Sequence, residues 1–336
     1  MAEPHHLLIY EVSYRRLAER LRAIAPSMRI SVMDLQGRIS VDGVVVPIEE
    51  VRSTIGWPNL DIFAAECRRD YFRALLKSQT MRWVQSAAAG VDDPVFARLV
   101  AKGIVLTNSD AQGPAIADFI LGAALDFFQE GDERRRLQSE RQWQRLSFRE
   151  LADTSWLIIG FGHIGREAAR RAHAFGAGVV GVRRQVQNDA FAAEVVTLDR
   201  IGEFLPQADV IVLSCALNAA TRNLANADFF ARMKLDSLLV NIGRGGLVDE
   251  QALLAALDRD APRRAVLDVF QVEPLPAESP LWNHAKVRVS AHTSNSGSGN
   301  QRRGDELFLD NLARYLRGEP LRNRVGAQDL ASLQTG

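Results

Sequence analysis

A glycine-rich turn near the middle of the chain has the spacing of a phosphate-binding loop. The run Gly160-Phe161-Gly162-His163-Ile164-Gly165 follows three bulky apolar residues, 157–159, and precedes a helix-forming stretch, 166–174. Glycines in this pattern allow a tight turn, close approach of a pyrophosphate to the backbone, and packing of the helix on the strand. The N-terminus of the helix favours the phosphate charge. A loop without a ligand is the alternative, but the strand-turn-helix setting predicts a dinucleotide site.

Two arginines follow the next predicted strand, 178–182. At this point an acidic residue normally binds the adenosine ribose hydroxyls, whereas this chain has Arg183 and Arg184. A carboxylate would repel a 2′-phosphate, and a guanidinium can pair with it through two hydrogen bonds. Two solvated surface arginines are the alternative. The absence of an acid here predicts a preference for NADP(H) over NAD(H).

Three chemically capable residues follow three later strands. Arg244 lies in the segment 241–250, Glu273 in 267–276 and His292 in 290–294, and each segment leaves a predicted strand. In an open α/β sheet, ligands bind at the carboxyl ends of the strands. We therefore expect all three side chains at the sheet edge that carries the glycine turn.

The elements that must position these residues alternate along the chain. Short apolar strands and helices repeat in both halves, which predicts parallel α/β sheets, and 336 residues predict two domains. A nearly all-round apolar helix is expected at 114–129, followed by a solvated helical arm to residue 150. Its acids are interleaved with its bases, so a nucleic-acid patch is the poorer interpretation. The last helix is expected at 301–317.

The overall composition excludes several classes of partner. Lys plus Arg equals Asp plus Glu, 41 each, so there is no global field to attract nucleic acid or an anionic membrane. Residues 1–10 lack the pattern of a signal peptide, and the apolar run 115–128 is too short to span a bilayer. Cys67 and Cys215 are far apart without metal-ligand spacing. They predict reduced thiols in a cytoplasmic protein and no metal site.

Taken together, the motifs resemble those of the D-isomer-specific 2-hydroxyacid dehydrogenase family. The likeness covers nearly the whole chain, and the motifs occur in the family's order. The matching runs are the glycine turn 160–165, 223–234, 241–250, 267–276 and 279–292, with 83–92 and 103–108 in the first domain. This chain departs from the family pattern at 216–218, at Ser290-Ala291 and at Asp118, without losing a catalytic group.

The resemblance implies a catalytic set of Arg244, Glu273 and His292. A protonated His292 would give its proton to the carbonyl oxygen of a 2-oxo acid as the nicotinamide delivers a hydride. Glu273 would hold the imidazole and favour its charged form. Arg244 would hold the substrate carboxylate and polarise the carbonyl.

The resemblance also implies binding residues. Backbone N–H groups of the turn Ala88-Ala89-Gly90 would meet the same carboxylate as Arg244, although a plain tight turn is the alternative. Asp268 resembles the family residue near the nicotinamide amide, with a capping or hinge role as the alternative. The expected cofactor set comprises Gly160, Phe161, Gly162, His163, Ile164, Gly165, Arg183, Arg184, Cys215, Ala216, Ile242, Asp268 and His292.

In this family the cofactor domain is inserted into the substrate domain. The resemblance therefore implies a fold of two Rossmann-like or flavodoxin-like parallel-sheet domains. A discontinuous substrate domain would comprise 1–110 plus 296–336, and the NAD(P)-binding Rossmann domain 111–295. Closure at hinges in 108–113 and 292–297 would bring Ala88 to Gly90 onto the substrate. The region 114–150 resembles the family's dimer-forming elements and predicts a homodimer.

The leading functional prediction is an NADP(H)-preferring reductase of small 2-oxo acids such as glyoxylate or hydroxypyruvate. The arginine pair supports the cofactor, and the small side chains at 87–89 support a small substrate. A dehydrogenase of a bulkier D-2-hydroxy acid is the second interpretation, because the first domain shows no clear substrate-reading residue. A nicotinamide-binding regulator, like the family's corepressor branch, is the third.

Overall fold

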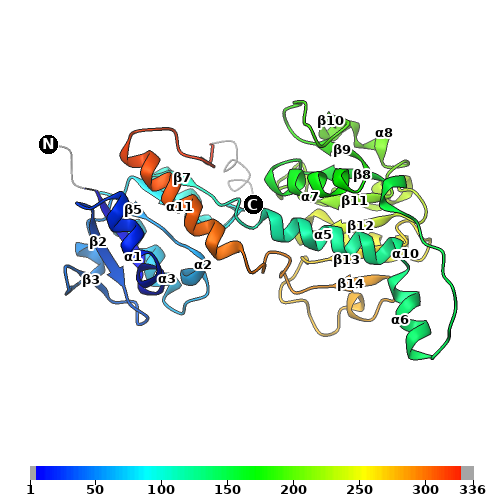
Figure 1. Cartoon of the computed structure of the whole chain (residues 1–336), viewed down its shortest axis with the longest axis horizontal. Helices are drawn as coiled ribbons and strands as arrows, with labels where there is room; N and C mark the ends of the chain where they lie inside the picture. Colours follow the sequence, from blue (N-terminus) through cyan, green and yellow to red (C-terminus); the bar gives the residue numbers. More distant parts are fainter. Residues whose placement is uncertain (1–4, 327–336) are drawn as a thin grey trace. The chain divides into compact units, whose positions relative to one another are not determined.

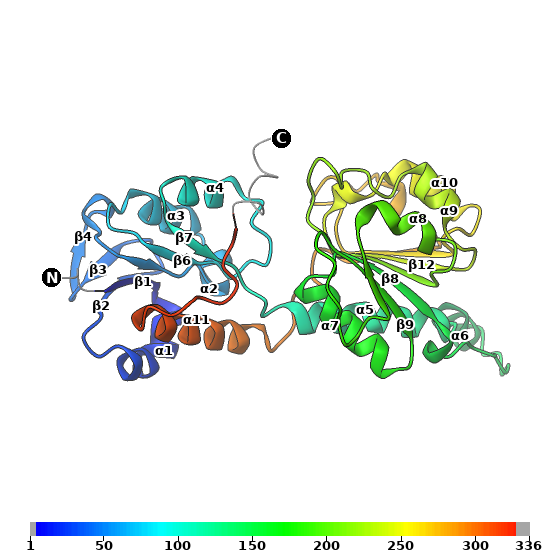
Figure 2. The same cartoon turned by 90° about the horizontal axis from the view of Figure 1, so that it is seen from above.

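The computed structural model describes residues 5–326, which form two compact units (Figures 1 and 2). The first unit runs up to Ala111 and resumes at Gly299, and the second comprises Gln112–Ser298. The prediction of two Rossmann-like, mainly parallel sheets is confirmed. Which unit binds which ligand stays a prediction. Within 5–326, no helix is long and apolar enough to cross a membrane.

The first unit contains a seven-stranded sheet in the order β4-β3-β2-β1-β5-β6-β7. Its strands are β1 (His6–Tyr10), β2 (Arg29–Met33), β3 (Ile39–Val41), β4 (Val44–Val46), β5 (Ile55–Gly56), β6 (Trp83–Gln85) and β7 (Val105–Thr107). Its helices are α1 (Glu11–Ile24), α2 (Leu60–Phe63), α3 (Arg68–Lys77), α4 (Pro94–Ala101) and α11 (Asn300–Leu316), with a 3-10 turn η1 (Ile48–Glu50).

The C-terminal helix α11 belongs to the core of the first unit (Figure 1). Phe308 of α11 is fully buried and stacks on Trp57 at 4.1 Å and on Trp83 at 5.8 Å between ring centroids. Buried aromatic side chains remove a large apolar area from water, so these contacts anchor the returning chain.

The second unit contains an all-parallel sheet in the order β10-β9-β8-β11-β12-β13-β14. Its strands are β8 (Ser155–Ile159), β9 (Gly178–Val182), β10 (Glu194–Val196), β11 (Val210–Leu213), β12 (Leu238–Asn241), β13 (Arg264–Leu267) and β14 (Val287–Val289). The first strand, β8, lies in the middle, and the order reverses between β8 and β11. Such a reversal point is where open α/β sheets bind ligands.

Helices cover both faces of this second sheet. They are α5 (Gly113–Phe128), α6 (Gly131–Ser139), α7 (His163–Ala174), α8 (Ile201–Phe204), α9 (Ala227–Arg232) and α10 (Glu250–Leu257), with 3-10 turns η2 (Leu151–Asp153), η3 (Leu198–Arg200), η4 (Gly245–Leu247) and η5 (Pro280–Trp282). Trp156 and Ile158 of β8 face the core under α5 and α7, whereas Leu157 and Ile159 face the core under α9 and α10. A strand buried on both faces explains the continuous apolar run before the glycine turn.

One local prediction was wrong. The arm predicted to be helical to residue 150 is helical only in α6, because its last residues, 141–148, have no buried apolar stripe to pack. Strands β2, β3 and β4 form an antiparallel meander, and β3 and β4 are joined at the turn Asp42-Gly43, where both residues have positive φ. Strand β5 has only two residues.

Candidate active site

The glycine turn connects β8 to α7 with the geometry of a phosphate cradle. Gly160 has a φ of +104°, and a Cβ there would lie 2.3 Å from the backbone nitrogen of Cys215. A Cβ on Gly165 would lie 2.4 Å from the carbonyl oxygen of Gly160, so this glycine lets α7 approach the strand. No heavy atom lies within 4 Å of a Cβ placed on Gly162, which leaves open space at the helix N-terminus. These features fit the phosphates of a dinucleotide.

Two predicted cofactor residues have different side-chain roles. Phe161 is 1% exposed and packs against Gly181 of β9, so it can offer a ligand only its backbone. Burial raises the pKa of the Cys215 thiol to about 11, which keeps this group protonated at neutral pH. Ser214 donates from Oγ to the Gly160 carbonyl at 2.9 Å and joins the turn to the end of β11.

The loop after β12 packs beside Cys215 and carries Arg244. A Cβ on Gly243 would lie 3.0 Å from the carbonyl oxygen of Cys215. Asn241, fully buried, accepts from the Gly243 N–H at 3.1 Å and donates to the Arg244 carbonyl at 3.1 Å. The half-buried Arg244 side chain donates from one terminal nitrogen to the Gly243 carbonyl at 2.7 Å. The backbone around Arg244 is therefore held by two hydrogen bonds, one from the Asn241 side chain and one from the Arg244 side chain.

The loop after β13 lies directly on the Arg244 loop. A Cβ on Gly245 would lie 1.8 Å from the carbonyl carbon of Phe270, so only glycine fits between the two backbones. The Gln271 side chain donates to the carbonyl of Val248 at 2.7 Å. Glu273 accepts from the Phe270 N–H at 3.0 Å through Oε1, which leaves its Oε2 for a second partner.

That partner is His292. Its Nδ1 lies 2.8 Å from Oε2 of Glu273. Nε2 makes no hydrogen bond with any residue in the range 5–326, and the side chain is 42% exposed. An imidazole fixed by a carboxylate at one nitrogen and open at the other is the arrangement of a general acid–base.

The backbone at His292 is held in an unusual conformation. Its φ is +54°, a left-handed value that costs a non-glycine residue about 1 kcal/mol. The buried carboxylate of Asp268 accepts from Ser290 Oγ at 2.6 Å and from the N–H groups of Thr293 and Ser294 at 2.8 and 3.1 Å. The Asp268 carbonyl accepts from the His292 N–H at 2.8 Å. Asp268 therefore fixes the loop on both sides of the histidine.

The arginine pair lies on the loop that follows β9. The Arg183 N–H donates to Val196 at 3.0 Å, and the Arg183 side chain is half-buried while Arg184 is exposed. Farther along this loop, Asp189 accepts from the Phe191 N–H at 3.1 Å and binds Arg166 of α7. The loop is thus tied to the helix that follows the glycine turn.

The turn Ala88-Ala89-Gly90 belongs to the first unit, after β6. The Ala88 N–H lies 3.0 Å from Ser86 Oγ, and the Ala89 carbonyl accepts from the Asn108 side chain at 2.6 Å. The turn is therefore braced by its own neighbours. Its role toward a substrate stays a prediction.

The three predicted catalytic residues lie on loops that the contacts of Gly245, Phe270 and Glu273 join into one cluster. The prediction from the sequence did not include the supporting residues Asn241 and Ser290, and it gave Asp268 a cofactor role without its contacts to the histidine loop. A polar residue at the end of an apolar strand was the available signal, because a buried polar side chain must find partners.

The glycine turn, the three joined loops and the doubly wound sheet define a nicotinamide-dependent oxidoreductase fold. A family model described as D-isomer specific 2-hydroxyacid dehydrogenase, NAD binding domain, matches residues 121–294. The chain belongs to this family of oxidoreductases.

Curated relatives carry two different names. Glyoxylate/hydroxypyruvate reductase B of Salmonella schwarzengrund is 32% identical over 76% of this chain and 82% of that protein. D-3-phosphoglycerate dehydrogenase of Methanocaldococcus jannaschii is 30% identical over 77% of this chain, and the match spans 50% of that longer protein.

Solved structures agree with the family. A D-isomer specific 2-hydroxyacid dehydrogenase of Xanthobacter autotrophicus, solved with NADPH and MES, has a TM-score of 0.77 at 26% identity and covers 97% of this chain and 99% of that one. A family protein of Aeromonas salmonicida has a TM-score of 0.76 at 29% identity, with the same coverage.

Proposed function

We propose that this protein reduces a small 2-oxo acid of the glyoxylate or hydroxypyruvate type to the D-2-hydroxy acid, with NADPH preferred over NADH. The observation that carries the proposal is the Glu273–His292 pair, whose open Nε2 stands on the loop cluster that also carries Arg244. The Salmonella relative named glyoxylate/hydroxypyruvate reductase and the NADPH-bound Xanthobacter structure support the substrate class and the cofactor.

The chain's own residues perform the proton and charge steps. His292 gives a proton from Nε2 to the substrate carbonyl oxygen, while Glu273 at Nδ1 stabilises the charged imidazole. Arg244 pairs with the substrate carboxylate and stabilises negative charge on the carbonyl oxygen. In the reverse direction, neutral His292 accepts the hydroxyl proton. The bound nicotinamide supplies or accepts the hydride.

The cofactor would be held by the glycine turn and the loops around it. The open space at Gly162 and the N-terminus of α7 suit the pyrophosphate, and Arg183 with Arg184 suits a 2′-phosphate. Cys215, Ala216 and Ile242 lie on the neighbouring loops after β11 and β12, the side where we place the rest of the dinucleotide.

The test is a steady-state assay of the full chain with a panel of 2-oxo acids and both cofactors. We expect the largest kcat/KM with glyoxylate or hydroxypyruvate and NADPH. A clear preference for phenylpyruvate would favour the dehydrogenase of bulkier acids. No turnover with any acid, together with tight NADPH binding, would favour the regulator. A clear preference for NADH would contradict the role of the arginine pair.

We also propose a homodimer formed through residues 114–150, in the cytoplasm. Trp143 is fully exposed and Phe148 is 52% exposed on the segment that follows α6, and large exposed apolar side chains mark interaction surfaces. Light scattering should give a molar mass about twice 37.2 kDa. Trp143→Ser should shift the protein toward the monomer, and a monomeric wild type would contradict the proposal.

A further inference from the structure

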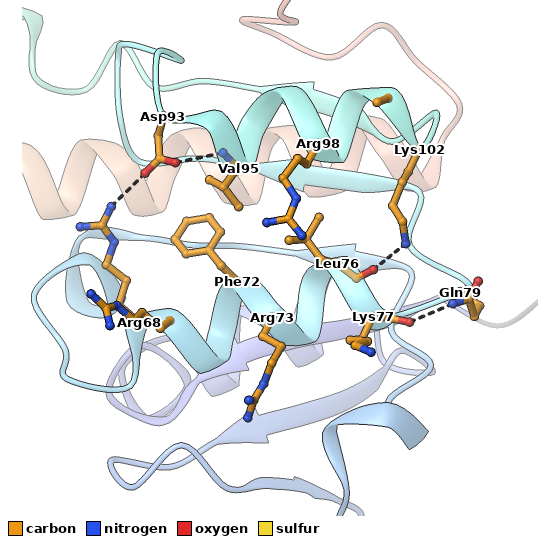
Figure 3. A pocket seen from close by; sticks show the side chains of 12 residues that line it. Arg68, Phe72, Arg73, Leu76, Lys77, Gln79, Asp93, Val95, Arg98 and Lys102 are labelled. Atoms are coloured by element: carbon orange, nitrogen blue, oxygen red, sulfur yellow. Dashed lines mark hydrogen bonds and ion pairs between the residues drawn. The ribbon is translucent and has the colours of Figure 1, made fainter. Parts of the chain in front are cut away.

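A groove on the first unit lies between α3 and α4, apart from the loops described above (Figure 3). Its volume is about 1090 Å³. Phe72 and Leu76 from α3 and Val95 from α4 point toward one another between the helices. The floor of the groove is therefore apolar, although Phe72 itself is only 7% exposed.

The rim of this groove is strongly cationic. It carries six basic residues and one acid, namely Arg68, Arg69, Arg73, Lys77, Arg98, Lys102 and Asp93. The acid already pairs with Arg68 at 3.3 Å, and Arg73 pairs with Asp70 at 2.9 Å. This excess of positive charge is a local feature of the groove, because the whole chain has a formal net charge of zero.

Four of these cations, Arg69, Lys77, Arg98 and Lys102, have no acidic partner within the described part of the chain, and Lys102 instead donates to the Leu76 carbonyl at 2.6 Å. Arg69, Lys77 and Arg98 are exposed and form no ion pair there. Arg98 extends from α4 into the space between the two helices (Figure 3). Like charges left without acidic partners around one groove repel one another, and an anionic occupant would relieve that repulsion.

The shape and the floor distinguish between kinds of anionic occupant. A groove of this volume exceeds what a small anion needs, and its cations are spread along two helices rather than converging on one point. A single-stranded nucleic acid would gain most from exposed aromatic rings on which its bases stack, whereas Phe72 is buried beneath Arg68, whose guanidinium lies 6.0 Å from its ring centroid. An apolar floor between cationic rims suits a segment with both apolar and acidic side chains.

We infer that the α3–α4 groove is a docking site for an acidic, amphipathic peptide segment of a partner protein. Apolar side chains of the segment enter between Phe72, Leu76 and Val95, and its carboxylates pair with Arg69, Lys77 and Arg98. This is the helix-in-groove mode of peptide recognition with added charge complementarity.

The test uses a fluorescein-labelled synthetic peptide with leucine and glutamate at helical spacing, titrated with the full chain and followed by anisotropy. Two further peptides separate the contributions: one replaces glutamate by glutamine, and one replaces leucine by serine. We expect binding of the first peptide only, weakening as salt is raised. A single-stranded oligonucleotide serves as the nucleic-acid probe.

The variant is Arg69→Glu/Arg98→Glu, matched by Arg22→Glu/Arg302→Glu. In each pair one residue lies near a helix start and one in the last turn of a helix of the first unit, and all four are exposed. We expect the groove variant to bind the peptide about tenfold more weakly and the control to change by less than about twofold. Circular dichroism of both variants verifies that they fold.

Several outcomes would overturn the inference. They are no binding of the leucine–glutamate peptide, equal weakening in both variants, or equal binding of the leucine-to-serine peptide or the oligonucleotide. Loss of binding on saturation with NADPH would also overturn it, because the peptide would then occupy the cofactor loops. A groove variant that does not fold is replaced by Lys77→Gln/Arg98→Gln, with the same expected direction.

Discussion

Two loops at the carboxyl edge of the second sheet are built in opposite ways. The His292 loop, 290–294, is held by the buried Asp268 through a side-chain hydroxyl and three backbone N–H groups. The Arg183 loop, 183–192, exposes a run of side chains from Arg184 to Asn188 and is tied to α7 through Asp189. The His292 loop is fixed by these hydrogen bonds, whereas the Arg183 loop presents positively charged side chains to solvent.

The difference follows from what each loop is proposed to do. Proton transfer requires a nitrogen placed within hydrogen-bond reach of one oxygen, so small displacements are costly. Recognition of a 2′-phosphate needs positive charge nearby and tolerates more freedom, because guanidinium groups can adjust. We therefore expect changes in the His292 loop to act on turnover, and changes in the Arg183 loop to act on the choice of cofactor.

The largest effect is expected for His292→Ala. Without the imidazole there is no positioned proton donor, so kcat should fall by about a hundredfold or more with either cofactor. Steady-state kinetics measures this loss, and the Kd for NADPH from fluorescence titration should change far less than kcat. Unchanged turnover would remove His292 from the mechanism.

A smaller loss is expected for Asp268→Asn, since it weakens the support of the left-handed residue while leaving the imidazole in place. We expect kcat to fall by about thirtyfold, within the range for a misplaced acid–base group. Ser290→Ala, which removes a single donor to Asp268, is the matched control and should cost less. If the Kd for NADPH rises while kcat is preserved, Asp268 acts on the cofactor instead.

The arginine pair should affect one cofactor only. In Arg183→Ala/Arg184→Ala we expect kcat/KM with NADPH to fall by about tenfold, the equivalent of one charged contact of about 1.4 kcal/mol, and kcat/KM with NADH to stay nearly constant. Arg170→Ala, an exposed arginine on α7, is the control. An equal loss with both cofactors would show that the pair supports the fold rather than the phosphate.

The smallest effect is expected for Arg166→Ala, which removes the tie between α7 and Asp189. The freed carboxylate would add negative charge and mobility to the arginine loop. KM for NADPH should rise by about threefold, with kcat unchanged, because the pair is half exposed on the Arg166 side, although the Asp189 side chain is only 8% exposed. A large fall in kcat would mean that Arg166 also supports the catalytic loops.

Much of the second sheet could be predicted from the sequence because its strands are continuous apolar runs. The run before Gly160 and the stretch 238–241 are short apolar runs bounded by turn residues, which favours buried parallel strands and predicts Gly160 and Arg244 at one edge of the sheet. The first sheet was harder. The two-residue strand β5 and the hairpin strands β3 and β4 are too short to show a clear period.

The supporting contacts could not be predicted, for a physical reason. The role of Asp268 depends on which N–H groups a loop of positive φ turns toward it, and this is set by tertiary packing rather than by local pattern. The need for glycine at position 245 is likewise set by tertiary packing, because the Phe270 backbone lies directly against it. The spacing of residues in the sequence identifies side chains that could do chemistry. Which buried neighbours hold those side chains in place is decided by how the chain packs.

The most direct test of the account is the ratio of kcat/KM for NADPH over NADH, measured with one 2-oxo acid in three proteins. We predict a ratio above one in the wild type, the same ratio in His292→Ala despite its low turnover, and a ratio near one or below in Arg183→Ala/Arg184→Ala. A ratio that falls in the histidine variant, or persists in the arginine variant, would contradict the division of roles between the two loops.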